Sequence, residues 1–160
     1  PKEFEMFIGV GYSKMNSIRE DVYNKAKQLG YTLASYVSTK CTYLSQYTPG
    51  DNTMIFENNT IQPFVKIGSN VFLWSGNHIG HHTCIDDHNF ISSHVVVSGH
   101  CKIESNCFLG VNASVGDKTT ISSGTILGAG VTITKDTEKK SVYVSEKPKK
   151  LPKTSDKINL

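Results

Sequence analysis

Aliphatic side chains recur at every sixth position through the middle of the chain. The pattern begins at Ile55, ends at Ile133 and has no interruption, although only 38% of the residues are hydrophobic. The fourteen positions are Ile55, Ile61, Ile67, Leu73, Ile79, Ile85, Ile91, Val97, Ile103, Leu109, Val115, Ile121, Leu127 and Ile133. A period of six matches neither the 3.6 residues of an α-helical turn nor the alternation of a hairpin strand. It is typical of a solenoid built from hexapeptide repeats.

A second set of positions, two residues before each aliphatic residue, also suits an interior. These residues are Val65, Val71, Asn77, Thr83, Asn89, Val95, Cys101, Cys107, Ala113, Thr119, Thr125 and Val131. The residue directly after each aliphatic position is often Gly, Ser or Asp, as in Gly68, Gly80 and Asp86. We expect these residues to form tight corners between short strands.

The repeat over residues 53–135 resembles the left-handed parallel β-helix of the hexapeptide-repeat acyltransferases. The resemblance implies three hexapeptides per triangular coil, so that residues eighteen apart stack in columns about 4.8 Å apart. The expected inner columns are Ile61/Ile79/Val97/Val115/Ile133, Ile55/Leu73/Ile91/Leu109/Leu127 and Ile67/Ile85/Ile103/Ile121. The fold class expected is therefore mainly β, with a left-handed parallel β-helix domain over residues 41–136.

The first forty residues carry a different pattern. Residues 4–10 (FEMFIGV) and 31–37 (YTLASYV) are expected to form strands. Between them, Ser17 to Glu20 (SIRE) predicts a capping box, and Gly30 is expected to end the helix. The expected apolar stripe of the helix is Ile18, Val22, Tyr23, Ala26 and Leu29.

This order predicts a partial βαβ, Rossmann-like unit over residues 1–40. One such unit cannot bury both faces of its sheet, so we expect a further N-terminal portion upstream of Pro1. Residues 7–19 (FIGVGYSKMNSIR) and 33–35 resemble the second half of a nucleotide-sugar-binding subdomain. That subdomain precedes the β-helix in acetyltransferases of the sialic-acid O-acetyltransferase and bacillosamine N-acetyltransferase type.

The hexapeptide repeat stops at Asp136, and residues 137–160 form the expected third region. Seven lysines lie in it: Lys139, Lys140, Lys147, Lys149, Lys150, Lys153 and Lys157. One interpretation is a solvated tail, and the other is a cationic contact for the phosphates of a coenzyme. The family usually ends its β-helix with a Val-x-Gly-x-Pro-Ala turn, whereas residues 142–148 (VYVSEKP) lack the glycine.

Composition narrows the class of protein. The net charge is +3 and Arg19 is the single arginine, which does not suggest nucleic-acid binding. The four cysteines form no CxxC pair, so we expect free thiols in a reducing cytoplasm. No apolar run has the length of a membrane span, and the start does not resemble a signal peptide.

All six histidines lie between residues 78 and 100. Four of them, His82, His88, His94 and His100, occupy the same corner position of successive repeats, where a solvated histidine needs no further role. The repeat register aligns residues 79–85 (IGHHTCI) with the segment Ile-Glu-His-Asp-Cys-x-Ile of the sugar acetyltransferases.

That alignment places His81 at the catalytic histidine and His82 at the acid that raises its basicity. The resemblance implies that His81 is the general base. The alternatives are that His82 is the base or that neither is. Asp86 or Asp87, at the next corner, are candidates to orient His81.

The resemblance also implies acetyl-CoA as co-substrate, bound in a groove between two subunits of a homotrimer. The coenzyme positions it implies are Phe90, Gly99, Gly110, Val111, Gly128 and Ala129. The geometry of a tight corner accounts for the presence of each glycine equally well. Phe90 occupies the position at which one relative has a histidine. A neutral imidazole can take the proton that an amine or hydroxyl loses when it attacks a thioester.

A metal site is the main alternative use of the histidines, because γ-class carbonic anhydrases are also trimeric left-handed β-helices. They place two histidines five residues apart and a third well upstream, a spacing that this chain lacks. Corner side chains six residues apart are expected to point to different faces, whereas zinc ligands converge to about 2.0–2.1 Å from the ion. We therefore expect no metal.

Two aromatic residues eighteen apart, Phe56 and Trp74, are expected to stack on the outside of the coils. They would pack against the N-terminal unit or provide a platform for a sugar or base ring.

The sequence thus predicts an acetyl-CoA-dependent acetyltransferase. The expected acceptor is the amino group of a nucleotide-linked amino-deoxysugar, for bacterial surface glycan synthesis. The alternatives are a sugar O-acetyltransferase of the sialic-acid type and a catalytically silent hexapeptide-repeat scaffold.

Overall fold

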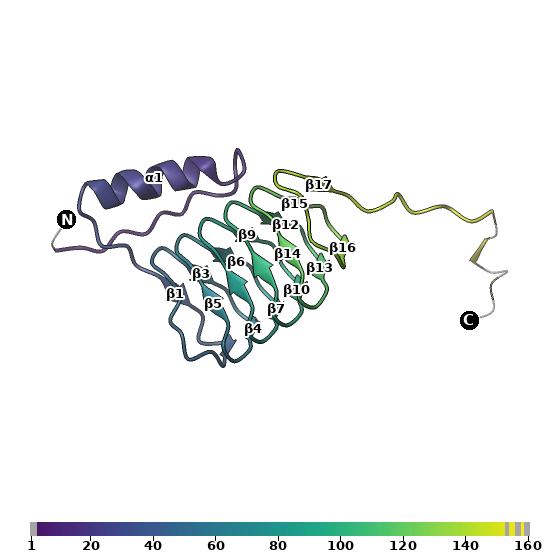
Figure 1. Ribbon diagram of the computed structural model, residues 1–160, viewed down its shortest axis with the longest axis horizontal. Coiled ribbons are helices and arrows are strands. Elements are labelled where there is room, and N and C mark those ends of the chain that lie inside the picture. The colour runs from purple at the N-terminus through teal and green to yellow at the C-terminus, as the bar shows by residue number, and fades with distance from the viewer. Residues whose placement is uncertain (1–2, 153, 156–157, 159–160) are drawn as a thin grey trace.

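The chain folds into a left-handed β-helix, as the hexapeptide repeat predicts. The computed structural model describes residues 3–152, 154, 155 and 158. The coils stack along one axis, with one helix alongside them and the C-terminal segment leading away from the last coil (Figure 1). Every strand is two residues long.

The strands form three parallel sheets. The seven-strand sheet contains β1 (Tyr36–Val37), β3 (Met54–Ile55), β6 (Phe72–Leu73), β9 (Phe90–Ile91), β12 (Phe108–Leu109), β15 (Ile126–Leu127) and β17 (Val142–Tyr143). The six-strand sheet contains β2 (Thr42–Tyr43), β4 (Thr60–Ile61), β7 (His78–Ile79), β10 (Val96–Val97), β13 (Ser114–Val115) and β16 (Thr132–Ile133). The four-strand sheet contains β5 (Lys66–Ile67), β8 (Cys84–Ile85), β11 (Lys102–Ile103) and β14 (Thr120–Ile121).

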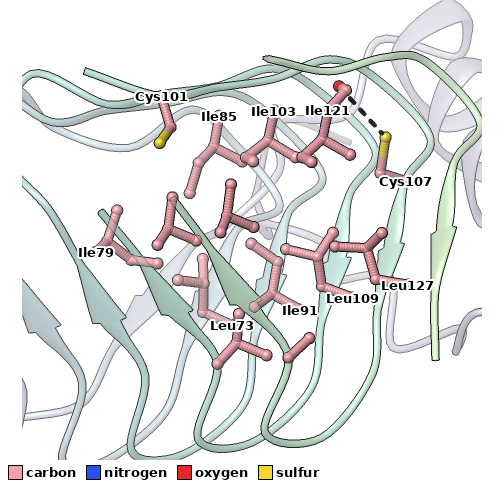
Figure 2. Close-up of a cluster of buried hydrophobic side chains, with 14 of the residues drawn as sticks. Leu73, Ile79, Ile85, Ile91, Cys101, Ile103, Cys107, Leu109, Ile121 and Leu127 are labelled. Carbon is pink, nitrogen blue, oxygen red and sulfur yellow. Dashed lines mark hydrogen bonds between the residues drawn. The ribbon is translucent and has the colours of Figure 1, made fainter. Parts of the chain in front are cut away.

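The register confirms the eighteen-residue coil. Val97 pairs with Ile79 on one side and with Val115 on the other, each eighteen residues away. The aliphatic columns fill the interior, where Leu73, Ile91 and Leu109 have no exposed surface (Figure 2). All four cysteines are free, as expected, and Cys101 and Cys107 are buried in this interior.

Buried amides connect one coil to the next. The side-chain oxygen of Asn77 accepts a hydrogen bond from the backbone N–H of Val95 at 2.7 Å, and that of Asn59 accepts from Asn77 at 3.1 Å. Among the described residues, no buried side-chain nitrogen or oxygen lacks a partner. These amides satisfy backbone groups inside the β-helix, where an unpaired polar group would cost about 1–3 kcal/mol.

The corners differ from the prediction. Positive φ falls three residues after every aliphatic position except the last, Ile133, for example at Gly76 (φ 78°) and His82 (φ 59°). Asn, His and Gly are frequent there because they tolerate the left-handed region. Glycines directly after an aliphatic residue meet a different need: a Cβ on Gly80 would lie 2.5 Å from the backbone carbon of Ser98 in the next coil.

The N-terminal segment keeps the βαβ order, but its strands are reduced to one bridged pair. Helix α1 (Ser17–Gln28) lies between Met6 and Leu33, which pair in parallel. The expected strand at 31–37 divides, since Leu33 joins Met6 whereas Tyr36–Val37 forms β1 of the β-helix. Ile8, Ala26 and Leu33 form the small apolar cluster beneath the helix.

Two predictions about α1 are wrong. Its N-cap residue is Asn16, with no side-chain cap, and the Glu20 carboxylate instead accepts a hydrogen bond from Asn106 at 2.6 Å. The expected apolar stripe is largely exposed, since Ile18, Val22 and Leu29 are 37%, 40% and 60% exposed. The helix turns a polar face toward the β-helix because the corners beneath it present amides and carbonyl groups.

The β-helix also extends beyond residues 41–136. Strand β1 precedes this range, and β17 follows it by pairing with β15. The described lysines of the C-terminal region are exposed, and Lys153 and Lys157 lie outside the described residues. None of the described helices has the length and apolar character needed to cross a membrane.

Candidate active site

Three histidines meet at the edge between the six-strand and four-strand sheets. His81 and His82 follow β7, and His100 follows β10 in the next coil. The Nδ1 atoms of His81 and His82 are 3.1 Å apart. The His100 ring stacks on His82, with 4.7 Å between centroids, and meets His81 edge-on at 5.0 Å. We refer to His81, His82 and His100 as the histidine cluster, and all three are exposed.

The backbone of the corner sets this arrangement. His82 and His100 both have positive φ, 59° and 56°, and lie eighteen residues apart in one column. Phe64, one coil earlier in the same column, stacks on His82 at 4.6 Å. The His81 backbone N–H donates to Oε1 of Gln62 at 2.9 Å, and its carbonyl accepts from the His100 N–H at 2.9 Å.

The electrostatics at His82 favour a neutral imidazole. The pKa of His82 is lowered by desolvation first and then by its neighbours His100 and His81. The short Nδ1–Nδ1 contact requires one ring to donate and the other to accept. One of the two rings therefore carries a proton on Nδ1, and the other has its lone pair there.

His81 lies over Gly99 and faces Asp117. A Cβ on Gly99 would lie 2.8 Å from Cε1 and 2.9 Å from Nε2 of His81, and 3.2 Å from Oδ1 of Asp117. The missing side chain of Gly99 therefore makes room for the His81 ring, with a carboxylate beyond it. Sequence reasoning missed Asp117, although the eighteen-residue column His81/Gly99/Asp117 was a signal that could have found it.

The two acids considered for orienting His81 have other partners. Asp86 pairs with Lys102 at 3.7 Å, and Asp87 accepts a hydrogen bond from the backbone of Ser69 at 2.7 Å. Asp117, by contrast, shares the space above Gly99 with the His81 ring.

The expected coenzyme positions divide between two edges of the six-strand sheet. Only Gly99 lies at the histidine cluster. Gly110 and Val111 precede β13 and therefore occupy the opposite edge, and Gly128 and Ala129 follow one coil later. Within one chain, the structure does not bring these four residues to His81.

Phe90 lies beneath the N-terminal segment, with only 5% of its surface exposed. The Tyr12 ring packs on it at 4.8 Å, and both line a pocket of about 240 Å³ with Trp74 and Val111. Trp74 also stacks on Phe56 at 4.9 Å, which confirms the expected aromatic pair.

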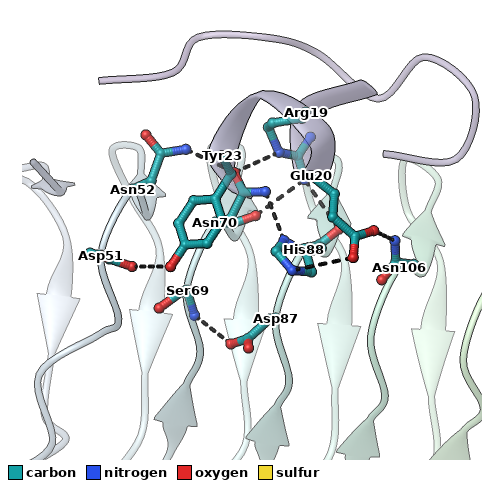
Figure 3. Close-up of polar contacts among 10 residues, drawn as sticks. All are labelled: Arg19, Glu20, Tyr23, Asp51, Asn52, Ser69, Asn70, Asp87, His88 and Asn106. Carbon is teal, nitrogen blue, oxygen red and sulfur yellow. Dashed lines mark hydrogen bonds and ion pairs between the residues drawn. The ribbon is translucent and has the colours of Figure 1, made fainter. Parts of the chain in front are cut away.

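Arg19 is a buried residue that sequence reasoning missed as a contact to the β-helix (Figure 3). Its guanidinium donates to Asn70 Oδ1 at 3.1 Å and to the carbonyls of Asn89 and His88 at 3.0 and 3.2 Å. It also lies 4.6 Å from the centre of the Phe72 ring. Burial lowers the pKa of Arg19 to about 10, so the side chain stays charged at neutral pH. One indication of this contact was visible in the sequence: Arg19 is the single arginine of the chain, and it lies on a helix that is only weakly apolar.

Several solved structures share this fold. The acetyltransferase domain of PglB from Neisseria gonorrhoeae FA1090 superposes with a TM-score of 0.83 at 23% identity, over 89% of this chain and 68% of that one. PerB from Caulobacter crescentus, in complex with CoA and GDP-perosamine, gives 0.80 at 21% identity, over 86% and 65%. WeeI from Acinetobacter baumannii AYE gives 0.77 at 20% identity, over 81% and 64%.

This chain thus spans about two thirds of the length of these structures, and identities this low show the fold alone. No curated protein matches it at the level of sequence. A family model does match, over residues 50–155, which is most of the β-helix. On that match, the chain belongs to the family described as the GMPPB C-terminal domain.

Proposed function

We propose that this protein is a CoA-dependent acyltransferase that acetylates the amino group of a nucleotide-linked amino sugar, with His81 as general base. The observation that carries the proposal is the exposed His81 ring, which lies over Gly99 between His82 and Asp117. The structure of PerB with CoA and GDP-perosamine supports the substrate class. We expect the protein to work in the cytoplasm and its product to be used in surface glycan synthesis.

The chemistry needs one base. The neutral amine of the sugar attacks the thioester carbonyl of acetyl-CoA, and a C–N bond forms while the amine gains positive charge. His81 takes a proton from this nitrogen and becomes an imidazolium. The C–S bond then breaks, and the proton passes to the departing CoA sulfur, so that amide and free thiol are the products.

The neighbours of His81 have distinct roles in this proposal. Asp117 is a positioning residue, since a carboxylate near the ring stabilises the imidazolium that forms during transfer. His82 shares the Nδ1 contact with His81 and fixes which ring nitrogen carries the proton. Gly99 keeps the space that the His81 ring occupies.

The coenzyme is proposed to bind between two subunits of a homotrimer. Gly110, Val111, Gly128 and Ala129 of one subunit would then face His81 of its neighbour, since these residues lie on opposite edges of the six-strand sheet. The lysines of residues 139–150 would contact the phosphates, and the nucleotide of the sugar would bind beside residues 1–40. A trimer by light scattering is the expected assembly, and a monomer would contradict the shared site.

The test is transfer from acetyl-CoA to a panel of nucleotide-linked amino sugars, followed by thiol release and product mass. His81→Ala should reduce kcat/KM by about 10²–10⁴-fold, the usual contribution of a general base. His94→Asn is the control, because it removes a histidine at another edge, and Asn tolerates the positive φ (58°) of His94. Equal rates in His81→Ala and the parent would contradict the assignment of the base.

A further inference from the structure

We propose that the histidine cluster is a binding site for a first-row divalent transition-metal ion, with Zn²⁺ as the representative ion. One ring nitrogen from each of His81, His82 and His100 lies within 4.8 Å of the other two. Three imidazoles with an open fourth position for water are a suitable donor set for Zn²⁺. The site lies on the surface, where an ion can enter directly.

The expectation of no metal rested on corner side chains six residues apart, and the structure assembles a different set. His82 and His100 are eighteen apart in one column, and His81 is adjacent to His82 in sequence. Stacking of successive coils therefore makes three histidines converge, which the six-residue spacing of His82, His88 and His94 does not.

The distances require only a small adjustment. Nitrogens bound to one tetrahedral zinc ion are about 3.3 Å apart, given Zn–N distances of about 2.0–2.1 Å. The Nδ1 atoms of His81 and His82 are already 3.1 Å apart. The His100 ring is exposed and, among the described residues, its nitrogens have no hydrogen-bond partner in the protein. Rotation of this one ring brings the third nitrogen toward the other two.

The surroundings favour a cation at this point. The Nδ1 atoms of His81 and His82 share one proton. A metal ion bound to both nitrogens would take the place of that proton. Neutral imidazole is the form that binds metal. Asp117 faces the ring of His81 across Gly99 and adds a negative charge to the surroundings of the ion.

Metal binding would oppose catalysis, a consequence that rests on the proposed function. A neutral imidazole has one nitrogen with a lone pair and one N–H. If the ion takes the lone pair of His81, this residue can no longer accept a proton from the attacking amine. Zn²⁺ is therefore expected to inhibit acetyl transfer reversibly, with activity recovered on addition of EDTA.

The test is titration of the metal-free protein with Co²⁺, followed by visible absorption, and with Zn²⁺ by calorimetry. The parent should bind one ion per chain. His82→Asn and His100→Asn keep a residue that tolerates positive φ, and each should weaken binding at least about tenfold, because even outer-shell partners contribute 10–100-fold. His94→Asn should bind like the parent, and circular dichroism should show that all variants fold.

Unchanged affinity in His82→Asn and His100→Asn, or no binding by the parent, would overturn the site. The rate of acetyl transfer in EDTA tests the proposed function without metal. Binding by the cluster in a protein that transfers no acetyl group would leave the metal site standing and remove the proposed function. Transfer that Zn²⁺ does not inhibit, in a protein that binds the ion through the cluster, would overturn the inhibitory role.

Discussion

Inside the β-helix, each coil repeats the same aliphatic contacts, whereas the N-terminal segment is attached to the outside by contacts that occur once. Leu73, Ile91 and Leu109 stack without exposed surface in one of three such columns. The N-terminal segment has a cluster of three buried apolar residues and depends on Arg19, whose guanidinium makes six hydrogen bonds. One region therefore repeats one kind of contact, and the other combines single contacts of several kinds, among which Arg19 makes the most side-chain hydrogen bonds.

The difference has an energetic basis. Burying a leucine or isoleucine side chain contributes about 1.5–3 kcal/mol, and the columns repeat this contribution coil after coil. Arg19 bears a buried charge without a carboxylate among its hydrogen-bond partners, so its contribution lies in satisfying carbonyl and amide oxygens. Removing it would leave the backbone carbonyls of Asn70 and His88 without another donor among the described residues, at about 1–3 kcal/mol for each one that water does not reach. Asn70 Oδ1 and the Asn89 carbonyl would keep donors in Asn52 and Phe72.

The largest expected effect is in the interior. Leu109→Ala should lower the free energy of unfolding by about 2–5 kcal/mol, because it removes methyl groups and leaves a cavity in a packed column. Guanidinium unfolding at one fixed protein concentration measures it. Leu109→Met, which nearly conserves volume, should cost less than about 1.5 kcal/mol. Equal losses in the two variants would show that the column is not tightly packed.

A smaller and local loss of stability is expected where the N-terminal segment contacts the β-helix. Arg19→Met keeps an unbranched stem but removes the guanidinium with its hydrogen bonds, and should cost about 2–3 kcal/mol. Hydrogen exchange of the Ile8 amide, which donates to Asn52 at 2.7 Å, should become faster. The Phe108 amide, which bonds across coils to Thr125, should stay protected.

Lys27→Met is the control for this variant. Lys27 lies on the same helix and pairs with Asp51, but its side chain is 47% exposed, so its loss should cost about 0–1 kcal/mol. Equally fast exchange of the Ile8 and Phe108 amides in Arg19→Met would remove the distinction between the two regions, because it would mean that the β-helix opens with the N-terminal segment.

The smallest expected effect is a pH dependence at the same interface. Burial lowers the pKa of His88, the charges of Glu20 and Asp87 oppose this shift, and that of Arg19 adds to it. Nδ1 of His88 accepts a hydrogen bond from the Asn70 amide at 2.8 Å, and protonation would break it. A lowered pKa means that the unfolded chain binds the proton first. Stability is therefore complete above about pH 6.5 and is lost as the pH falls below it.

Unfolding in urea between pH 7.5 and 5 measures this loss, which cannot exceed about 1.4 kcal/mol per pH unit for one proton. His88→Asn should flatten the profile, whereas His94→Asn should leave it unchanged. Asp51 does not interfere in this range. Burial opposes its ionisation, but hydrogen bonds from Lys27, Tyr23 and Ser69 outweigh burial and lower its pKa. An identical slope in His88→Asn and the parent would assign the pH dependence to other groups.

The sequence was sufficient for the fold because the interior of a β-helix admits one kind of residue at each sixth position. Its ends were less predictable. Val37 of β1 pairs with Ile55 in the eighteen-residue register, but Pro49 interrupts the aliphatic series between them, and Tyr143 of β17 pairs with Leu127, sixteen residues earlier. The repeat register also placed His81 at an edge, and the eighteen-residue column placed His82 beside His100. The expectation that the histidines would not converge was wrong, because it compared neighbours along the chain rather than neighbours between coils.

The docking of α1 could not be predicted, because an apolar stripe indicates the buried face only where the partner surface is apolar. Here the surface beneath the helix consists of corner residues such as Asn70 and His88, with free carbonyl groups between them. A guanidinium with five N–H donors suits that surface better than Ile18 or Val22 does. Nothing in the helix alone indicates which kind of surface it will meet.

The positions of positive φ have a consequence for how this fold can change. Away from the N-terminal segment, the three edges offer one side chain per coil at positive φ, where the backbone requires a residue that tolerates the left-handed conformation. Asn, His, Lys, Phe and Gly all occupy these positions in this chain, above an interior that stays aliphatic. Single substitutions can therefore add, remove or shift a reactive group by one coil while the packing inside is untouched. In this fold, the reactive groups on the surface can change without a change in the residues that stabilise the interior.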